Sequence, residues 1–395
     1  MSDTDHPLLP AATPVLSSGP DALQVGGVDS TDGVLLSPAG GGLAAVLRGL
    51  DGRRAQRSVL ADAARAGLDP AAVTRVLDGL RGAGLVVDVE ASDLLAADAG
   101  SAAAARAAAE LPAALARAPA AARPFPGGSP WRARRAATVV IDGATRVGAP
   151  LAAVLAASGV GRVSIRDSGP ATAGDVVVGG LTAADEGRPR SVAAADAVRR
   201  VSPLTDLRPL APEGRADLVV LARAWAGSDP LVAAVHRAGV PHLVATVRGE
   251  TGVVGPLVVP GVTSCLRCAD LHRRDADPRW PGLAAQLTAS EPPPSGATVT
   301  CLLTAATAAV QVLAYLDGVT SPAVVDATLE VRPPDLVPRV RRWKAHPACD
   351  CGAVSADGGP DSSPGGVPPA GGRSFGQSAP PAGRMNRHAS SRAHL

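Results

Sequence analysis

The chain has 395 residues, of which 46% are hydrophobic but only 2% are aromatic, and its formal net charge is +2. A charge this close to zero cannot neutralise many phosphates, and so few aromatic side chains cannot form a base-stacking platform. We therefore expect no nucleic-acid partner. Lys344 is the only lysine, which excludes the P-loop motif, because that motif needs a lysine after its glycines.

The N-terminus and the longest apolar stretch together predict a cytoplasmic protein without a membrane partner. The opening segment, MSDTDHPLLPAATP, lacks the basic start and apolar run of a secretory signal. The stretch from Cys301 to Leu316 is interrupted by Gln311 and several threonines, and it is too short to span a bilayer. We expect it to be a buried helix.

Three segments have compositions that do not favour a packed core. Residues 1–20 and 352–395 are rich in Pro, Gly and Ser without periodicity, which predicts disordered tails. Residues 91–130 are rich in Ala but are interrupted by prolines, which break helices. We expect this third segment to be a connector.

Residues 21–90 are predicted to form a small separate domain. A strand at Leu23–Val25 precedes a helix at about Gly42 to Leu50, and two helical segments follow, SVLADAARAG and DPAAVTRVLDGLRGAG. The last begins at Asp69-Pro70 with apolar residues at helical spacing and ends at a glycine before an apolar strand. Two short helices followed by a strand resemble a winged helix-turn-helix. DNA binding is disfavoured, because its arginines are offset by aspartates.

From Ala136 onward strands and helices alternate, which predicts an α/β fold with parallel strands joined by crossover helices. The strand Ala137–Ile141 leads into the turn DGATRVG. Gly143 and Gly148 stand at the first and third glycines of the dinucleotide fingerprint G-x-G-x-x-G, whereas Thr145 replaces the second. The turn therefore indicates either a Rossmann-like nucleotide site with a degraded fingerprint or one of the many α/β turns of this kind that bind no ligand.

Two further residues belong to this candidate nucleotide site. Asp167 ends the second strand, about twenty residues after the turn, where Rossmann units place a carboxylate that binds the ribose hydroxyls. Arg146 has two interpretations: its guanidinium could bind phosphate at the helix N-terminus, or its bulk could fill the space of a nucleotide.

Four of the five cysteines form two close pairs, Cys265-Leu-Arg-Cys268 and Cys349-Asp-Cys351. Two such pairs can complete a tetrahedral zinc site, and a cytoplasmic chain does not normally use them as disulfides. The alternative is that the four cysteines are unrelated. Cys301 remains, either as a buried structural residue or as a nucleophile at a helix start.

The glycine turn, Asp167 and the cysteine pairs, in this order, resemble the ThiF/MoeB/HesA superfamily, the ubiquitin-activating-type adenylyltransferases, over about residues 131–351. The segments VGPLVVPGVTSCLRCADLHRRDADPRWPGL and HPACDC are similar to variants tied to peptide modification, such as partners of azole-forming cyclodehydratases. Those variants often carry an N-terminal winged-helix peptide-binding element. Residues 21–90 look like such an element.

The resemblance implies a function and a set of ligands. Family members activate a carboxyl terminus by attack on the α-phosphate of ATP, usually with magnesium held near a catalytic aspartate. Asp167 then matches the ribose-binding acid, and Arg190 falls where the family has its phosphate-binding lysine. The implied cofactors are zinc and, in an active member, ATP and Mg²⁺. The implied partner is a peptide, a small carrier protein or a peptide-modifying enzyme, and the family often forms homodimers.

The chain departs from the family after the strand Asp217–Leu221. It reads Ala222-Arg-Ala-Trp where the family has Thr-Asp, so Ala224 lacks the metal-binding carboxylate. Asp229, five residues further, is better explained as a helix start. We assign no catalytic residue. Two functions stay open: an adenylyltransferase with degraded catalysis, and a non-catalytic scaffold that binds a peptide or protein for a peptide-modifying enzyme.

Overall fold

The structure is a computed structural model, and the residues it describes are 5–27, 33–89, 110, 130–211, 213–223, 226–288, 294–318 and 320–353. Most of the expected connector, the expected tail from residue 354 onward and Ala224 lie outside these residues.

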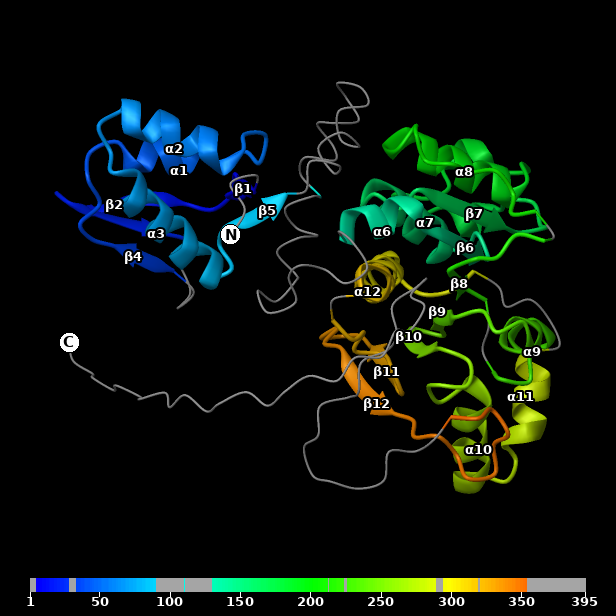
Figure 1. Ribbon diagram of the computed structural model, residues 1–395. Coiled ribbons are helices and arrows are strands. Elements are labelled where there is room, and N and C mark those ends of the chain that lie inside the picture. Colours follow the sequence, from blue (N-terminus) through cyan, green and yellow to red (C-terminus); the bar gives the residue numbers. More distant parts are fainter. Residues whose placement is uncertain are drawn as a thin grey trace.

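The N-terminal unit combines short antiparallel strands with three helices (Figure 1). Its strands are β1 (His6–Leu8), β2 (Val15–Gly19), β3 (Ala22–Val25), β4 (Val34–Leu36) and β5 (Val87–Val89). Its helices are α1 (Leu43–Arg48), α2 (Gln56–Arg65) and α3 (Pro70–Gly82). Strands β2, β3 and β4 form one sheet in that order, and β1 pairs with β5.

Strands β1 and β2 correct the expectation of a tail over residues 1–20. The Pro-rich composition there concealed apolar residues that pack into the core of this unit, among them Leu9 and Val15, each 6% exposed. The helix that was expected after Asp69 is present. The Asp69 side chain accepts hydrogen bonds from the amides of Ala71 and Ala72 and so caps α3. The winged-helix assignment itself stays a prediction.

A seven-stranded sheet organises the larger unit in the order β12-β11-β10-β9-β8-β6-β7. Its strands are β6 (Thr138–Asp142), β7 (Arg162–Arg166), β8 (Leu218–Leu221), β9 (His242–Arg248), β10 (Thr251–Val258), β11 (Ala327–Val331) and β12 (Arg339–Arg342). Strands β7, β6, β8 and β9 are parallel, and the rest pair antiparallel. The predicted α/β fold with parallel strands is confirmed.

Helices cover both faces of this sheet. They are α6 (Pro130–Ala136), α7 (Gly148–Ala157), α8 (Arg190–Val201), α9 (Pro230–Arg237), α10 (Leu266–Ala276), α11 (Trp280–Thr288) and α12 (Thr298–Asp317). Alternate residues of β6 face opposite layers, as the two-residue period of a strand requires. Val139 and Ile141 pack with α7 and α12, whereas Val140 packs in the cluster that contains residues of α9.

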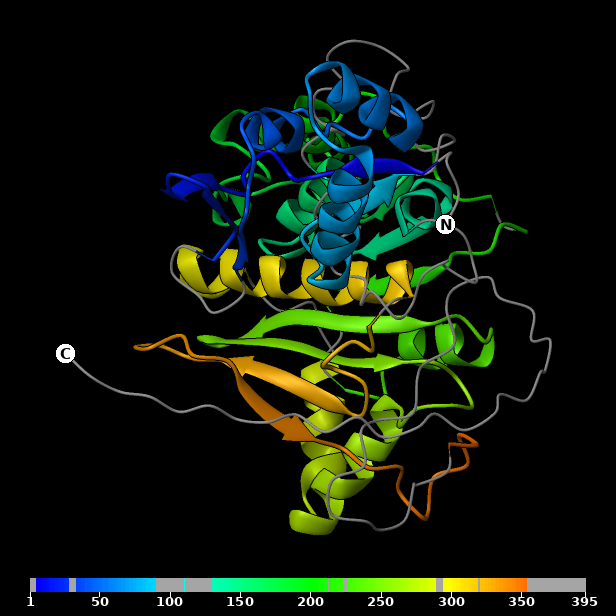
Figure 2. The same cartoon turned by 60° about the vertical axis from the view of Figure 1, so that its left-hand side comes forward.

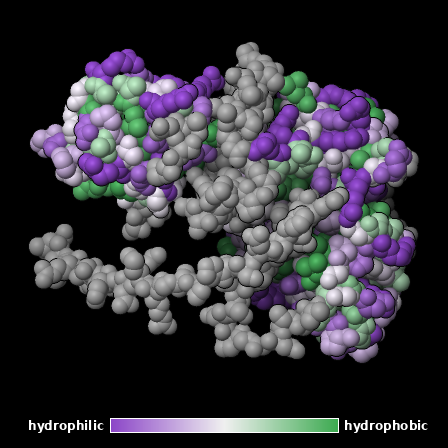
Figure 3. All heavy atoms as spheres, in the orientation of Figure 1, coloured by the Kyte–Doolittle hydropathy of each residue, from purple (hydrophilic) through white to green (hydrophobic). Residues whose placement is uncertain are grey.

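Helix α12 is long and apolar enough to cross a membrane by length and composition alone. Instead most of it is buried, and it lies along the sheet where it contacts β9, β10, α6 and α7 (Figure 2). This agrees with the expected buried helix. At its end, Asp317 forms an ion pair with Arg134 of α6, and both side chains are buried, at 2% and 0% exposure. On the face in Figure 3, hydrophilic and hydrophobic side chains are interspersed over the coloured residues.

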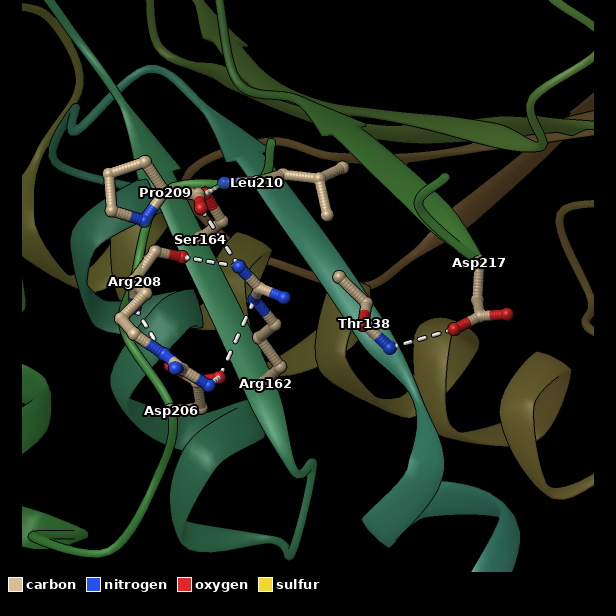
Figure 4. Close-up of polar contacts among 8 residues, drawn as sticks. All are labelled: Thr138, Arg162, Ser164, Asp206, Arg208, Pro209, Leu210 and Asp217. Atoms are coloured by element: carbon tan, nitrogen blue, oxygen red, sulfur yellow. Dashed lines mark hydrogen bonds and ion pairs between the residues drawn. The ribbon is translucent and has the colours of Figure 1, made fainter. Parts of the chain in front are cut away.

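Polar contacts hold the N-terminal ends of strands β6 and β7 (Figure 4). The carboxylate of Asp217 accepts the amide of Thr138 at 2.7 Å. Arg162 donates to the carbonyl of Pro209 at 2.8 Å. These contacts lie at the strand ends opposite the glycine turn, so they fix the strands while their C-terminal ends stay available for a site.

Candidate functional site

The glycine turn lies at the C-terminal end of β6, between the parallel neighbours β7 and β8. This is the switch point at which α/β sheets bind ligands. Gly143 has φ of +108°, a value that favours glycine. A Cβ atom on Gly148 would come within 1.9 Å of the Gly143 carbonyl oxygen. Both predicted glycines are therefore required by the backbone of the turn.

Thr145 occupies hydrogen-bond donors that a phosphate would use. Its hydroxyl oxygen accepts from the amides of Val147 and Gly148, at 3.3 and 3.1 Å. Helix α7 begins here, and the free amides of a helix N-terminus are the usual donors to an anion. Thr145, which replaces the second glycine, thus caps α7 with its own hydroxyl, so these two amides already have an acceptor within the protein.

Asp167 and Arg190, which were predicted as separate nucleotide ligands, bond to each other. The Asp167 carboxylate is fully buried and accepts from Arg190 Nε at 3.0 Å. It also accepts from the amides of Ala144 at 2.8 Å and Gly169 at 3.1 Å. Arg190 lies close over Gly169, where a Cβ atom would meet its guanidinium at 2.4 Å. Three of the roughly four acceptor positions of this buried carboxylate are therefore already used within the protein.

Arg146 reaches across the site to the start of α12. Its guanidinium donates to the carbonyl of Gly296 and, at 2.7 Å, to the hydroxyl of Thr298. Of the two interpretations from the sequence, this geometry favours the one in which the side chain fills space.

Arg223, which sequence reasoning did not assign to the site, lies against the glycine turn. It donates to the carboxylate of Asp142 at 3.1 Å, and its Cγ would be 2.7 Å from a Cβ atom on Gly143. Burial raises the pKa of Asp142 despite this guanidinium. The signal in the sequence was that Arg223 lies in the segment where the chain departs from the Thr-Asp expected by resemblance.

The three arginines leave a small pocket at the C-terminal ends of the strands. Its cavity volume is about 50 Å³, whereas ligand pockets usually measure about 300–1,000 Å³. Its lining includes Arg146, Arg190 and Arg223. Among the described lining residues, Asp175 is the only carboxylate, and it is bonded to the amide and hydroxyl of Thr172. The residues present therefore fit a magnesium ion poorly.

The four predicted zinc ligands, in contrast, come together. The Sγ atoms of Cys265, Cys268, Cys349 and Cys351 all lie within 4.8 Å of one another. Neighbouring sulfurs are 3.6–3.8 Å apart, which matches the edge of about 3.8 Å in a tetrahedron with Zn–S bonds of about 2.3 Å. The geometry and the soft donors fit zinc.

Local structure favours the thiolate form at one of the four predicted ligands, Cys268. Cys265 is the N-cap of α10 and Cys268 lies in its first turn, where the helix dipole favours thiolate. The Cys265 thiol donates to the Cys268 sulfur, which lowers the pKa of Cys268 and raises the pKa of Cys265. Burial raises the pKa of Cys349. Cys301 lies apart at the start of α12, and burial raises its pKa, which favours the structural interpretation.

Comparison with known proteins gives one family match and several similar solved structures. The ThiF family matches residues 126–353. The crystal structure of E. coli MccB with MccA-N7isoASN has a TM-score of 0.60 and 15% identity, covering 89% of this chain and 100% of that chain. MccB with ATP has a TM-score of 0.59 and 16% identity, covering 87% and 99%.

A third similar structure is PaaA, with a TM-score of 0.52 and 17% identity, covering 68% of this chain and 90% of that chain. No curated protein matches the sequence. Identities this low establish the shared fold alone, so they leave ligands and activity to be argued from the residues.

Proposed function

Because the chain belongs to the ThiF family, we propose that it binds a peptide and presents it to a peptide-modifying enzyme, with adenylation of the peptide carboxylate lost or much weakened. Its fold is that of the ThiF-type adenylyltransferases. One observation supports the proposal: the two residues that the resemblance assigns to ribose and phosphate, Asp167 and Arg190, bond to each other.

Opening the site would break several contacts at once. The Asp167–Arg190 pair, the Arg223–Asp142 pair and the Thr145 cap surround the glycine turn, where we expect a nucleotide to bind. Leaving a buried donor or acceptor unpaired costs about 1–3 kcal/mol each. A nucleotide would have to replace these bonds and also enlarge a pocket of about 50 Å³. The expected nucleotide affinity is therefore low.

Two observations support a peptide partner. The similar MccB structures include complexes with MccA, in N-formylated form in one case. In the N-terminal unit, β2 and β4 are the edges of the three-stranded sheet, and they expose Leu16 and Leu35, at 48% and 63%. An exposed edge with apolar side chains can bind an extended peptide as an additional strand. The N-terminal unit would then hold the peptide and the ThiF domain would dock the partner enzyme.

Zinc has a structural role in this proposal. Bound by the four cysteines, it would join the start of α10 to the loop at residues 349–351 and supply no chemistry at the arginine-lined pocket, because structural zinc sites have all four positions filled by protein ligands. A homodimer stays an expectation from the family.

The second candidate function is adenylation itself. The arginine-lined pocket supports it, since guanidinium groups bind phosphate, and a similar MccB structure contains ATP. Arg146, Arg190 and Arg223 would then hold the phosphates after moving apart.

Selection followed by an exchange assay separates the two functions. The full chain is used to select binders from a displayed peptide library without nucleotide, and the enriched peptides are tested for pyrophosphate exchange into ATP. We expect peptides that bind equally well with and without ATP, and no exchange above the peptide-free control. Peptide-dependent exchange at about 1 s⁻¹ or faster, an ordinary enzyme rate, would contradict the scaffold and establish the second candidate.

A further inference from the structure

A second pocket lies between α9, the start of α10 and the cysteine loop. Its cavity volume is about 400 Å³, within the usual range for small-molecule sites. Val232 and Ala233 of α9 and Leu266 of α10 give it one apolar side. Its other lining includes three of the predicted zinc ligands and the charged side chains beside them: Cys265, Cys349, Cys351, Arg237, Arg267 and Asp350. It shares no lining residue with the arginine-lined pocket, so it is independent of the nucleotide site.

Two histidines in the lining of this pocket carry nitrogens with no hydrogen-bond partner among the described residues. They are His236 Nδ1 and His242 Nε2, and both atoms are buried. The two rings pack edge to face, with centroids 5.8 Å apart. A buried polar atom without a partner costs about 1–3 kcal/mol, so each one in a folded protein calls for an explanation, such as strain, a functional role, or a bound water or ion.

The hydrogen-bond pattern shows what kind of group is missing at His242. Its Nδ1 lies 2.9 Å from the carbonyl oxygen of Val240. A carbonyl can only accept, so Nδ1 carries the proton. Burial lowers the pKa of His242 to about 4, so the ring is neutral at pH 7. Nε2 is then an acceptor, and the missing group is a hydrogen-bond donor.

We propose that this pocket binds a small apolar ring compound with an N–H or O–H donor, which bonds His242 while the ring packs against Val232 and Leu266. An apolar ring fits the side of the pocket formed by Val232 and Leu266, and its donor group satisfies the buried acceptor His242 Nε2. His242 is fully buried and His236 half-buried, so the donor binds at the floor of the pocket and His236 forms part of its wall. A water molecule on His242 is the competing explanation.

The test compares two probes that differ by one donor, indole and 1-methylindole, in calorimetric titrations of the zinc-loaded full chain. We expect indole to bind at least tenfold more tightly, which corresponds to ~1.4 kcal/mol. Equal affinity of the two probes, or no binding of either, would overturn the proposal and leave water as the partner of His242. Neither result bears on nucleotide or peptide binding.

Variants of the protein test whether the two probes bind in this pocket. His242→Phe should abolish the preference for indole, and an unchanged preference in a folded variant would overturn the proposal. If His242→Phe does not fold, Ala233→Trp tests the position instead, because it fills the pocket from α9 without changing either histidine. Ala233→Trp should abolish binding of both probes. The matched control is Ala234→Trp at the next, exposed residue of α9, which does not line the pocket and should bind indole as the parent does.

Discussion

Replacement of Cys268 by Ser is expected to release the bound zinc. We expect the unmodified chain to bind about one zinc ion per chain. Cys268 is fully buried and lies 3.6–3.8 Å from the sulfurs of Cys265 and Cys351. A hydroxyl is a poor zinc ligand, so three thiolates would remain around an incomplete tetrahedron. Structural zinc contributes on the order of 10 kcal/mol to small metal-dependent folds. Elemental analysis and thermal unfolding measure both effects.

The matched control for this prediction is Cys301→Ser, because Cys301 is also fully buried but lies outside the cluster. It should keep its zinc, even if the change lowers stability slightly. A parent protein that contains no zinc, or that unfolds at the same temperature with and without a strong chelator, would contradict the metal site.

Substitution of Arg134 by Ala should lower the free energy of unfolding by about 3–5 kcal/mol, because it removes the guanidinium that bonds the buried Asp317 carboxylate. The two side chains join α6 to the end of α12, and neither is more than 2% exposed. Urea unfolding gives the change in free energy.

The control substitution is Arg199→Ala. Arg199 forms an ion pair with Asp196 but is 56% exposed, and exposed pairs contribute about 0–1 kcal/mol. The double variant Arg134→Met with Asp317→Leu should recover much of the lost stability, since it removes both buried charges. Similar small losses in Arg134→Ala and Arg199→Ala would show that the buried pair is unimportant.

The parts of the fold that could be predicted from the sequence depend on local patterns. The strand at residues 137–141, the glycine turn and the helix after Asp69 each follow from residues close in the chain. The four cysteines were also predictable as a group, because the spacing within each pair is characteristic of zinc sites. Strands β1 and β2 were missed because a Pro-rich composition concealed Leu9 and Val15, which become buried only when distant helices pack on them.

The state of the nucleotide site could not be predicted, because it depends on contacts between distant residues. The resemblance assigns separate ligand roles to Asp167 and Arg190, but the sequence does not reveal that they bond to each other. Arg146 and Arg223 likewise find their partners, Thr298 and Asp142, many residues away along the chain. Motif matching assigns each residue a ligand role separately. In the structure, Arg190 and Arg223 instead donate hydrogen bonds to the carboxylates of Asp167 and Asp142.

The most direct test of the central claim, that these side chains close the nucleotide site, is a calorimetric titration of the full chain with ATP and Mg²⁺. The account predicts no binding tighter than about 1 mM, equivalent to −4.1 kcal/mol, because ATP would have to displace the Asp167–Arg190 and Arg223–Asp142 pairs. A dissociation constant in the micromolar range, weakened at least tenfold by Asp167→Ala, would contradict it and show that the site opens for nucleotide.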